Sequence, residues 1–420
     1  MERQRAVELD SLSPFELQDE LERLARKADV PEVLDAGKGQ PDWVATPPRD
    51  AFLLLGRFAL GEAERTATHS DAGWYPDTSG VAKRLGSFLT KHEKDPGAAL
   101  LKAAVDHGVK ALGFEPDAWV GELTVGMLGD RYPSPHRMLT HVEQVLHEYL
   151  LATHCVLEKP KGRFRLFGTE GGAAAMSYCF QSLRRNGLLG PGDKIAIGTP
   201  ILSPYLQIPM LPELGFEIVH IRADEAHGWR YPPDELNKLR HPGIKAFFLV
   251  DPGNPDTRAL GKDELKQIKE IVDTARPDLI ILTDTAYATF VKDFQSLLGS
   301  LPRQTIGVHP FSEHMGATGE RLAIIAVHED HVIDRLLREQ PPGQRSFRAE
   351  RYRTITDDLD HLGFVDRVVA DSREVALYYV AGLTPAQQVK MALFALVGLQ
   401  KFADAQHVVI DDLCKAYSEQ

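Results

Sequence analysis

The 420-residue chain is poor in cysteine and in basic residues, and it has no long apolar run. Its three cysteines (Cys155, Cys179 and Cys414) are widely spaced, so they predict neither a disulfide framework nor a zinc site. Because no stretch of about 18 apolar residues occurs, we expect no membrane span. The charged residues 1–28 lack the apolar core of a signal peptide. These absences predict a soluble cytoplasmic protein.

Positive charge is scarce, since 60 acidic residues outnumber 48 basic ones and the formal net charge is −12. Such a chain is repelled by nucleic acid and by anionic membranes, so neither is an expected partner. The local exception is the run RSFRAERYR (345–353), which we interpret as an exposed helix face or a subunit contact. The sequence also lacks the GxGxxG of a dinucleotide site and the GxxxxGK(S/T) of a P-loop. No metal site is predicted, because the His-x-x-His spacing in HEDH (328–331) follows a strand and begins a surface helix.

From about residue 140 the sequence alternates short apolar runs with helical stretches. Several runs are apolar throughout, as expected for strands that are buried on both faces of a mostly parallel sheet. Between two of them, GKDELKQIKEIVDTAR (261–276) has the spacing of an amphipathic crossover helix. The pattern predicts a doubly wound α/β domain, in which ligands bind at the carboxyl ends of the strands. The seven predicted strand segments are RFRLFG, DKIAIGTP, FEIVHIRA, IKAFFLVD, LIILTDT, TIGVHP and RLAIIAVH.

Glycines or polar residues follow three of these strands. The turn TEGG (169–172) can cradle a phosphate at a helix N-terminus, and it can equally be a tight packing turn. Asn254 lies in the proline-rich turn DPGNPD and can direct its amide above the sheet. Asp284 ends an apolar strand and precedes Tyr287 by three residues. A carboxylate there requires a partner, such as a protonated ring nitrogen, unless it caps the next helix.

In this order, TEGG, NP, DTAY (284–287) and FSEHMGATGER (311–321) resemble the aspartate aminotransferase-like family of the type I pyridoxal phosphate (PLP) fold, in particular its aspartate 4-decarboxylases. The resemblance implies a three-layer α/β/α fold with a mostly parallel sheet and a reduced small helical domain. It divides the chain into an N-terminal helical segment (1–120), a large α/β domain (121–375) and a truncated C-terminal helical segment (376–420). Further matching segments are LSPFELQDEL, AGKGQPDWVATPPRDAFLLLGRFAL, GDRYPSPHRML, GDKIAI, IKAFFLVDPGNP, GATGERLAIIAVHE and DRVVADSREVAL.

The resemblance also implies roles for individual residues. Asn254 and Tyr287 match the pair that hydrogen-bonds the phenolic oxygen of PLP. Asp284 matches the carboxylate that keeps the pyridine nitrogen protonated. Positions that match phosphate-binding groups are Thr169, Glu170, Gly171, Ser312 and Arg321, and positions that match substrate-binding groups are Lys38, where the family has arginine, and Arg373.

The chain departs from the family at several of its most informative positions. Glu313 stands where the family has the lysine that bonds PLP, and Pro310 replaces a phosphate-binding serine. Asp251 replaces an asparagine, and Glu320 replaces a tryptophan. The chain also ends at Gln420, short of the family's C-terminal subdomain.

Glutamate cannot form an imine, so the covalent bond to PLP is excluded by valence. Glu313 can still move protons, and its proximity to Asp284 should raise the pKa of one of the two carboxyl groups. Glu313, His314 and Tyr287 are therefore the candidate catalytic residues.

Three functions remain open. PLP or its amine form (PMP) binds without a covalent bond; the pocket is reused without PLP; or the protein is a non-catalytic subunit that binds an active aminotransferase-like partner. We favour an altered lyase or transferase that acts on an anionic or amino-acid-like small molecule, as a homodimer or larger homo-oligomer. His309 could also face this pocket.

Overall fold

The computed structural model describes residues 12–27, 41, 43–67, 72–131, 137–374 and 382–399. Its strands are β1 (Phe164–Thr169), β2 (Lys194–Thr199), β3 (Glu217–Arg222), β4 (Ile244–Val250), β5 (Ile280–Asp284), β6 (Thr305–Pro310) and β7 (Ala323–His328). They form one seven-stranded sheet in the order β1-β7-β6-β5-β4-β2-β3. β7 runs antiparallel to β1 and β6, and the other neighbouring strands are parallel.

All seven predicted strand segments form strands of this sheet. β5, β6 and β7 are buried at every position, because helices cover both faces of the sheet. This confirms the inference from the continuous apolar runs that the sheet is mostly parallel and covered on both sides.

The helices occupy the rest of the described chain. Those before β1 are α2 (Pro14–Lys27), α3 (Thr46–Arg65), α4 (Val81–Lys91), α5 (Ala98–Lys110), α6 (Pro116–Leu128) and α7 (Thr140–His154). Those between strands are α8 (Gly172–Arg185), α9 (Ser203–Met210), α10 (Pro233–Asn237), α11 (Lys262–Thr274) and α12 (Leu297–Ser300). Those after β7 are α13 (Val332–Arg338), α14 (Pro342–Tyr352), α15 (Phe364–Ser372) and α16 (Pro385–Gly398). Short 3-10 helices are η1 (Glu225–His227), η2 (Lys238–Arg240), η3 (Ala288–Phe290) and η4 (Thr318–Glu320).

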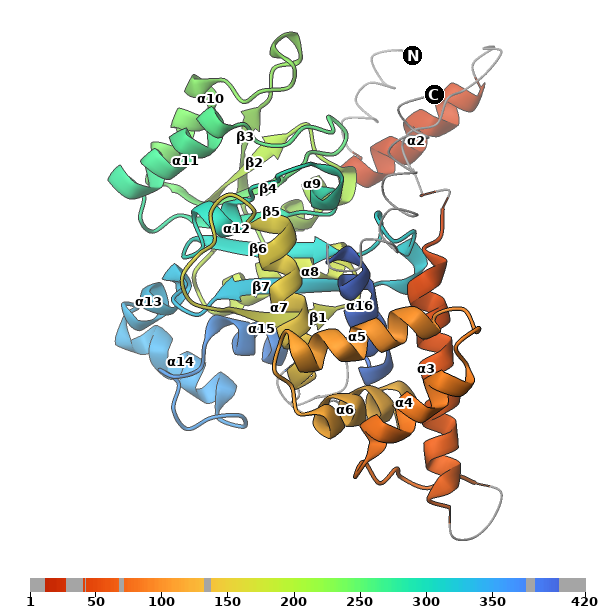
Figure 1. The fold of residues 1–420 in the computed structure, drawn as a ribbon. Coiled ribbons are helices and arrows are strands. Elements are labelled where there is room, and N and C mark those ends of the chain that lie inside the picture. The colour runs from red at the N-terminus through yellow and green to blue at the C-terminus, as the bar shows by residue number, and fades with distance from the viewer. Residues whose placement is uncertain are drawn as a thin grey trace.

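Two hydrophobic layers hold the helices on the sheet. Phe248 of β4 and Leu282 of β5 pack with α8 and α15 on one face. Phe247 and Ile281, the neighbouring residues on the same strands, point to the opposite face and pack with α11. This alternation follows from the two-residue period of a strand. In Figure 1, α10 and α11 lie side by side near β3, and α7 runs across one face of the sheet toward β1, in agreement with the contacts of α10 with β3 and α11 and of α7 with β1.

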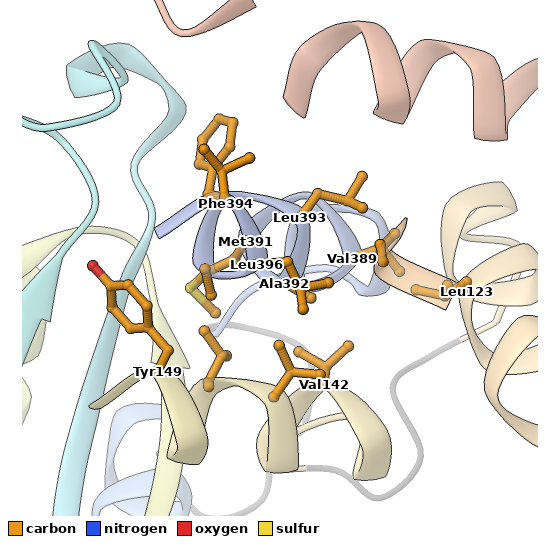
Figure 2. Close-up of a cluster of buried hydrophobic side chains, with 14 of the residues drawn as sticks. Leu123, Val142, Tyr149, Val389, Met391, Ala392, Leu393, Phe394 and Leu396 are labelled. Carbon is orange, nitrogen blue, oxygen red and sulfur yellow. The ribbon is translucent and has the colours of Figure 1, made fainter. Parts of the chain in front are cut away.

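A separate helical cluster packs against the β1 end of the sheet. α16 contacts α3, α6 and α7, so residues 385–398 complete a core begun by the first third of the chain. Figure 2 shows the apolar side chains of α16, among them Met391 and Phe394, beside Val142 and Tyr149 of α7 and Leu123 of α6. Residues 400–420, the last part of the predicted C-terminal segment, lie outside the described residues.

Two segments interpreted as surface features are exposed on one side and buried on the other. The basic run 345–353 forms α14 and the residue after it, but Arg348 and Tyr352 are buried, so the helix packs inward on one side. The HEDH segment precedes α13 as predicted, yet His328 and His331 are also buried. Nδ1 of His331 accepts a hydrogen bond from the Ile333 amide at 3.2 Å, which caps α13.

No group of three or more His, Cys, Asp or Glu side chains is arranged to hold a metal ion within the described ranges. Across the same ranges, no helix combines the length and the apolar character needed to span a bilayer.

Candidate active site

The candidate site is centred on Asp284, the last residue of β5. Its side chain is fully buried, with one oxygen accepting a hydrogen bond from the Tyr205 hydroxyl at 2.5 Å and the other from the Ala286 amide at 2.9 Å. Burial raises the pKa of Asp284 to about 6, and the nearby Glu313 carboxylate raises it further against the lowering effect of the two hydrogen bonds. A buried carboxyl held by neutral donors retains the capacity to meet a cationic ligand group.

Asn254 and Tyr287 face one another beside this carboxyl group. The Asn254 amide Nδ2 donates to the Tyr287 hydroxyl at 2.9 Å. Burial raises the pKa of Tyr287 to about 12, with further contributions from the negative charges of Glu313 and Asp284. Asp284, Asn254, Tyr287 and Glu313 therefore lie near one another at the carboxyl ends of β4 and β5, the edge at which parallel sheets bind ligands.

Glu313 lies in the turn that follows β6, close enough to Asp284 and Tyr287 for its charge to act on both. Its side chain is partly buried, and burial raises its pKa above the ordinary value. A partly buried carboxyl group with a raised pKa is a candidate for exchanging protons with a ligand. The sequence-based expectation that Asp284 and Glu313 lie close enough to perturb each other agrees with this geometry.

The glycine turn at the start of α8 brings backbone against the same pocket. Gly171 has φ +98°, and a Cβ atom at this position would lie 2.3 Å from Nη2 of Arg321. A Cβ on Gly172 would lie 2.6 Å from the Tyr205 hydroxyl and 3.0 Å from Oδ2 of Asp284. Only glycine permits these approaches. The turn is therefore tightly packed and places the N-terminus of α8 beside an arginine, and its role as a phosphate cradle stays a prediction.

Arg321 itself has φ +53°, and its Nη1 donates to the Thr318 carbonyl at 3.1 Å. The guanidinium group is solvent-exposed and remains able to bind an anion. The buried hydroxyl of Thr169, at the end of β1 just before the Gly171 turn, has no hydrogen-bond partner within the described residues. An arginine, an unpartnered hydroxyl and a helix N-terminus are suitable groups for a phosphate.

His314 is placed differently from its neighbour Glu313. It is fully buried, with Nε2 3.2 Å from the Tyr149 hydroxyl of α7. Burial lowers the pKa of His314 well below its ordinary value, so the imidazole is neutral. The same hydroxyl lies 3.1 Å from Nε2 of His309, whose Nδ1 is 3.1 Å from Nε2 of His154. His309 and His314 thus belong to a buried network on the α7 side, and the structure does not bring them to the Asp284 pocket.

Glu170 and Arg373 meet at a second place, near the segment that leads to α16. Glu170 accepts hydrogen bonds from the Gly382 amide at 2.5 Å and from the Tyr178 hydroxyl at 3.3 Å. Arg373 is buried at the end of α15, with its guanidinium carbon 5.7 Å from the centre of the Phe167 ring. A Cβ on Gly382 would lie 3.0 Å from Nη2 of Arg373. These contacts hold the polypeptide beside the pocket and involve neither Asp284 nor Glu313.

The other predicted positions differ in what they contact. Ser312 is buried, and its carbonyl accepts from the Ala317 amide at 2.7 Å. Glu320 pairs with Nζ of Lys390 at 2.9 Å and with Nε of Arg49 at 3.7 Å, so its charge is offset by two cations from α16 and α3. Lys38 lies outside the described residues.

Sequence reasoning missed Tyr205, which contacts the central carboxyl group of the site. It lies on α9 in the segment ILSPYLQIP, where proline and apolar residues suggest only a turn and a packing surface. Its role depends on the close approach of α9 to the end of β5, which no local pattern encodes. A buried tyrosine usually finds a hydrogen-bond partner, and this one finds Asp284.

Known proteins share both the sequence pattern and the fold. The model of the family described as aminotransferase class I and II matches residues 134–346. A bifunctional aspartate aminotransferase and L-aspartate beta-decarboxylase from a Pseudomonas species is 42% identical over 409 residues, which cover 97% of this chain and 77% of that relative.

Solved structures extend the likeness to three dimensions. Pyrococcus protein-A1 matches with a TM-score of 0.56 and 19% identity, over 98% of this chain and 75% of its own. A tetra mutant of Thermus thermophilus aspartate aminotransferase matches with a TM-score of 0.51 and 17% identity, over 76% of this chain and 69% of its own. The predicted type I PLP-transferase fold is confirmed.

Proposed function

The chain belongs to the aminotransferase class I and II family, and within it we propose an altered lyase or transferase that binds PLP or PMP without a covalent bond. Its substrate would be an amino-acid-like or anionic small molecule. The observation that carries this proposal is the proximity of Asp284, Tyr287, Asn254 and Glu313 at the carboxyl ends of β4 and β5. Three of the four are the groups expected around a pyridoxal ring, and the fourth is a carboxyl group where an amine is needed for an imine.

The residues of the pocket fit the cofactor. Asp284 is buried and has only neutral hydrogen-bond donors, so a protonated ring nitrogen would supply its missing countercharge. The Asn254–Tyr287 pair presents an amide and a hydroxyl for the phenolic oxygen. Arg321, with the turn at Gly171, would hold the phosphate. When bound, the pyridoxal ring would supply an electron sink for a carbanion at the amino-acid carbon.

Without the covalent bond, affinity depends on these polar contacts alone. Glu313 would take or return the proton that a lysine handles elsewhere, and burial raises its pKa above the ordinary value for a glutamate. Glu320, the other added acid, is already paired with Lys390.

Replacing Glu313 tests the proposal directly. The wild type, Glu313→Lys and Glu313→Gln would each be incubated with PLP and followed by absorbance. Borohydride reduction and intact-protein mass would follow. We expect a reversible spectrum and no mass gain for the wild type and Glu313→Gln, and an imine spectrum with a fixed adduct for Glu313→Lys.

Two results would count against the proposal. A borohydride-fixed adduct on the wild type would show that another lysine bonds the cofactor. Failure of all three proteins to bind PLP or PMP would favour the alternative, a non-catalytic subunit that binds an active aminotransferase-like partner.

A further inference from the structure

Three arginines lie close together among helices α13, α14 and α15, away from the candidate active site. Arg338 ends α13, Arg348 lies on α14 and Arg367 on α15. The three line one small cavity together with Asp334 and Asp360. None of these residues belongs to the Asp284 pocket, so the cluster is independent of the function proposed above.

Arg348 is buried without a countercharge. Only 2% of the residue is exposed, and Nη2 donates to the Leu337 carbonyl at 3.0 Å. Nε and Nη1 are buried and have no hydrogen-bond partner within the described residues. Nor does any carboxylate of the described chain form an ion pair with Arg348. A buried, unpaired guanidinium group is costly, since it stays charged at any pH that proteins tolerate.

Arg367 is also buried without an ion pair to any carboxylate of the described chain. It is 3% exposed, and its three nitrogens donate only to neutral oxygens: the carbonyls of Leu362 at 3.0 Å and Leu359 at 2.9 Å, and the side chain of Asn186 at 3.1 Å. Burial lowers the pKa of Arg367. Burial also lowers the pKa of Arg348, and the positive charge of Arg367 lowers it further. Two desolvated cations therefore face each other across the cavity.

The two acids of the cavity offset this charge only in part, since Asp334 interacts with Arg367 and Asp360 with Arg348, but neither acid forms an ion pair with either arginine. Asp360 pairs with Arg345, a further cation of α14. Burial raises the pKa of Asp334, and one of its oxygens accepts from the Phe364 amide at 3.0 Å. Arg338 is exposed at the edge of the cavity and forms no hydrogen bond or ion pair with any described residue. The cavity lining as a whole keeps an excess of positive charge.

We propose that this cavity is a binding site for one small monatomic anion, with chloride as the representative species. Its small volume, about 10 Å³, suits an ion close to the size of a water molecule better than a bulky organic anion. The unpartnered Nε and Nη1 of Arg348 are the donors that such an ion needs. An anion there compensates both buried arginines and joins α13, α14 and α15 into one unit.

Thermal unfolding of the full chain tests the site. Sodium chloride would be titrated against sodium gluconate at constant ionic strength, so that general screening is the same throughout. For the wild type we expect a saturable rise of Tm with chloride, as linkage requires for a ligand that binds only the folded state. Bromide should act similarly and give an anomalous scattering peak at Arg348 in crystals.

Three variants identify the site. Arg348→Met should lose the chloride response and match or exceed the wild-type Tm in gluconate, because it removes an unpaired buried charge. Arg338→Gln, at the exposed edge, should still fold and weaken apparent chloride affinity by about tenfold. Arg353→Gln, an exposed arginine just after α14, should respond as the wild type does.

Several outcomes would overturn the proposal. Equal Tm values in chloride and gluconate would mean that the cavity holds water. An unchanged chloride response in Arg348→Met, or in Arg338→Gln if Arg348→Met does not fold, would place the ion elsewhere.

Discussion

Replacing Asp251 with asparagine should make the protein more stable above neutral pH. Asp251 follows β4 and is 1% exposed. One of its oxygens accepts from the Leu260 amide at 2.9 Å, and the other is buried with no hydrogen-bond partner in the described chain. Burial raises the pKa of Asp251 from 3.8 to about 7, against the lowering effect of the Leu260 amide, and the nearby carboxylates of Glu264 and Asp256 add to the rise.

The sign of the effect follows from proton linkage. Between pH 3.8 and about 7, the folded protein keeps a proton on Asp251 that the unfolded chain has lost. The favourable contribution of the neutral acid is complete below pH 3.8 and disappears as the pH rises through about 7. A difference of about three pKa units corresponds to at most about 4 kcal/mol in the free energy of unfolding.

Asp251→Asn keeps the acceptor for the Leu260 amide and cannot ionise. We therefore expect the variant to equal the wild type near pH 4 and to exceed it by up to about 4 kcal/mol at pH 8. Urea unfolding at several pH values between 4 and 8.5 would measure the difference, and Asp357→Asn, on the exposed surface, is the matched control. Parallel stability–pH curves for the wild type and Asp251→Asn would refute the reasoning.

Two further substitutions probe the candidate site. Tyr205→Phe removes a hydrogen bond that lowers the pKa of Asp284. The affinity for PLP or PMP should fall at acid pH as Asp284 becomes protonated, near pH 6 in the wild type, and this midpoint should move up by about one pH unit in the variant. Fluorescence titration of the cofactor across pH measures the midpoint, and an unchanged midpoint would contradict the assignment. Gly171→Ala should cost about 1–3 kcal/mol of stability and weaken phosphate-dependent binding, because of the positive φ and the approach of Arg321. Gly319→Ala, where a Cβ meets nothing within 4 Å, is the control, and equal unfolding midpoints for the two variants would refute the steric argument.

The sheet could be predicted from sequence because its signal is local. Continuous apolar runs such as IKAFFLV report burial on both faces of a strand, and the structure places this run in β4. The acidic and amide residues that follow the strands could also be predicted, since parallel strands end at the same edge of the sheet. Asp284 and Asn254 were found on that basis, although their roles came from the family resemblance.

Contacts between distant segments could not be predicted in this way. Tyr205 reaches Asp284 only because α9 lies across the end of β5. His314 follows Glu313 directly, yet its side chain packs against Tyr149 of α7. The burial of Arg348 within a run of charges depends on α13 and α15, which the local sequence of α14 does not reveal.

The position of α16 sets the order in which this protein can mature during synthesis. Its contacts with α3 and α6 join segments more than 250 residues apart, and the helical layer has an open hydrophobic seam until residue 398 has been made. Closing so long a loop gives the layer a high contact order. The sheet, whose strands lie between residues 164 and 328, can fold earlier. The nascent chain then has a folded sheet beside helices whose apolar side chains are still exposed, and chaperones could bind these side chains.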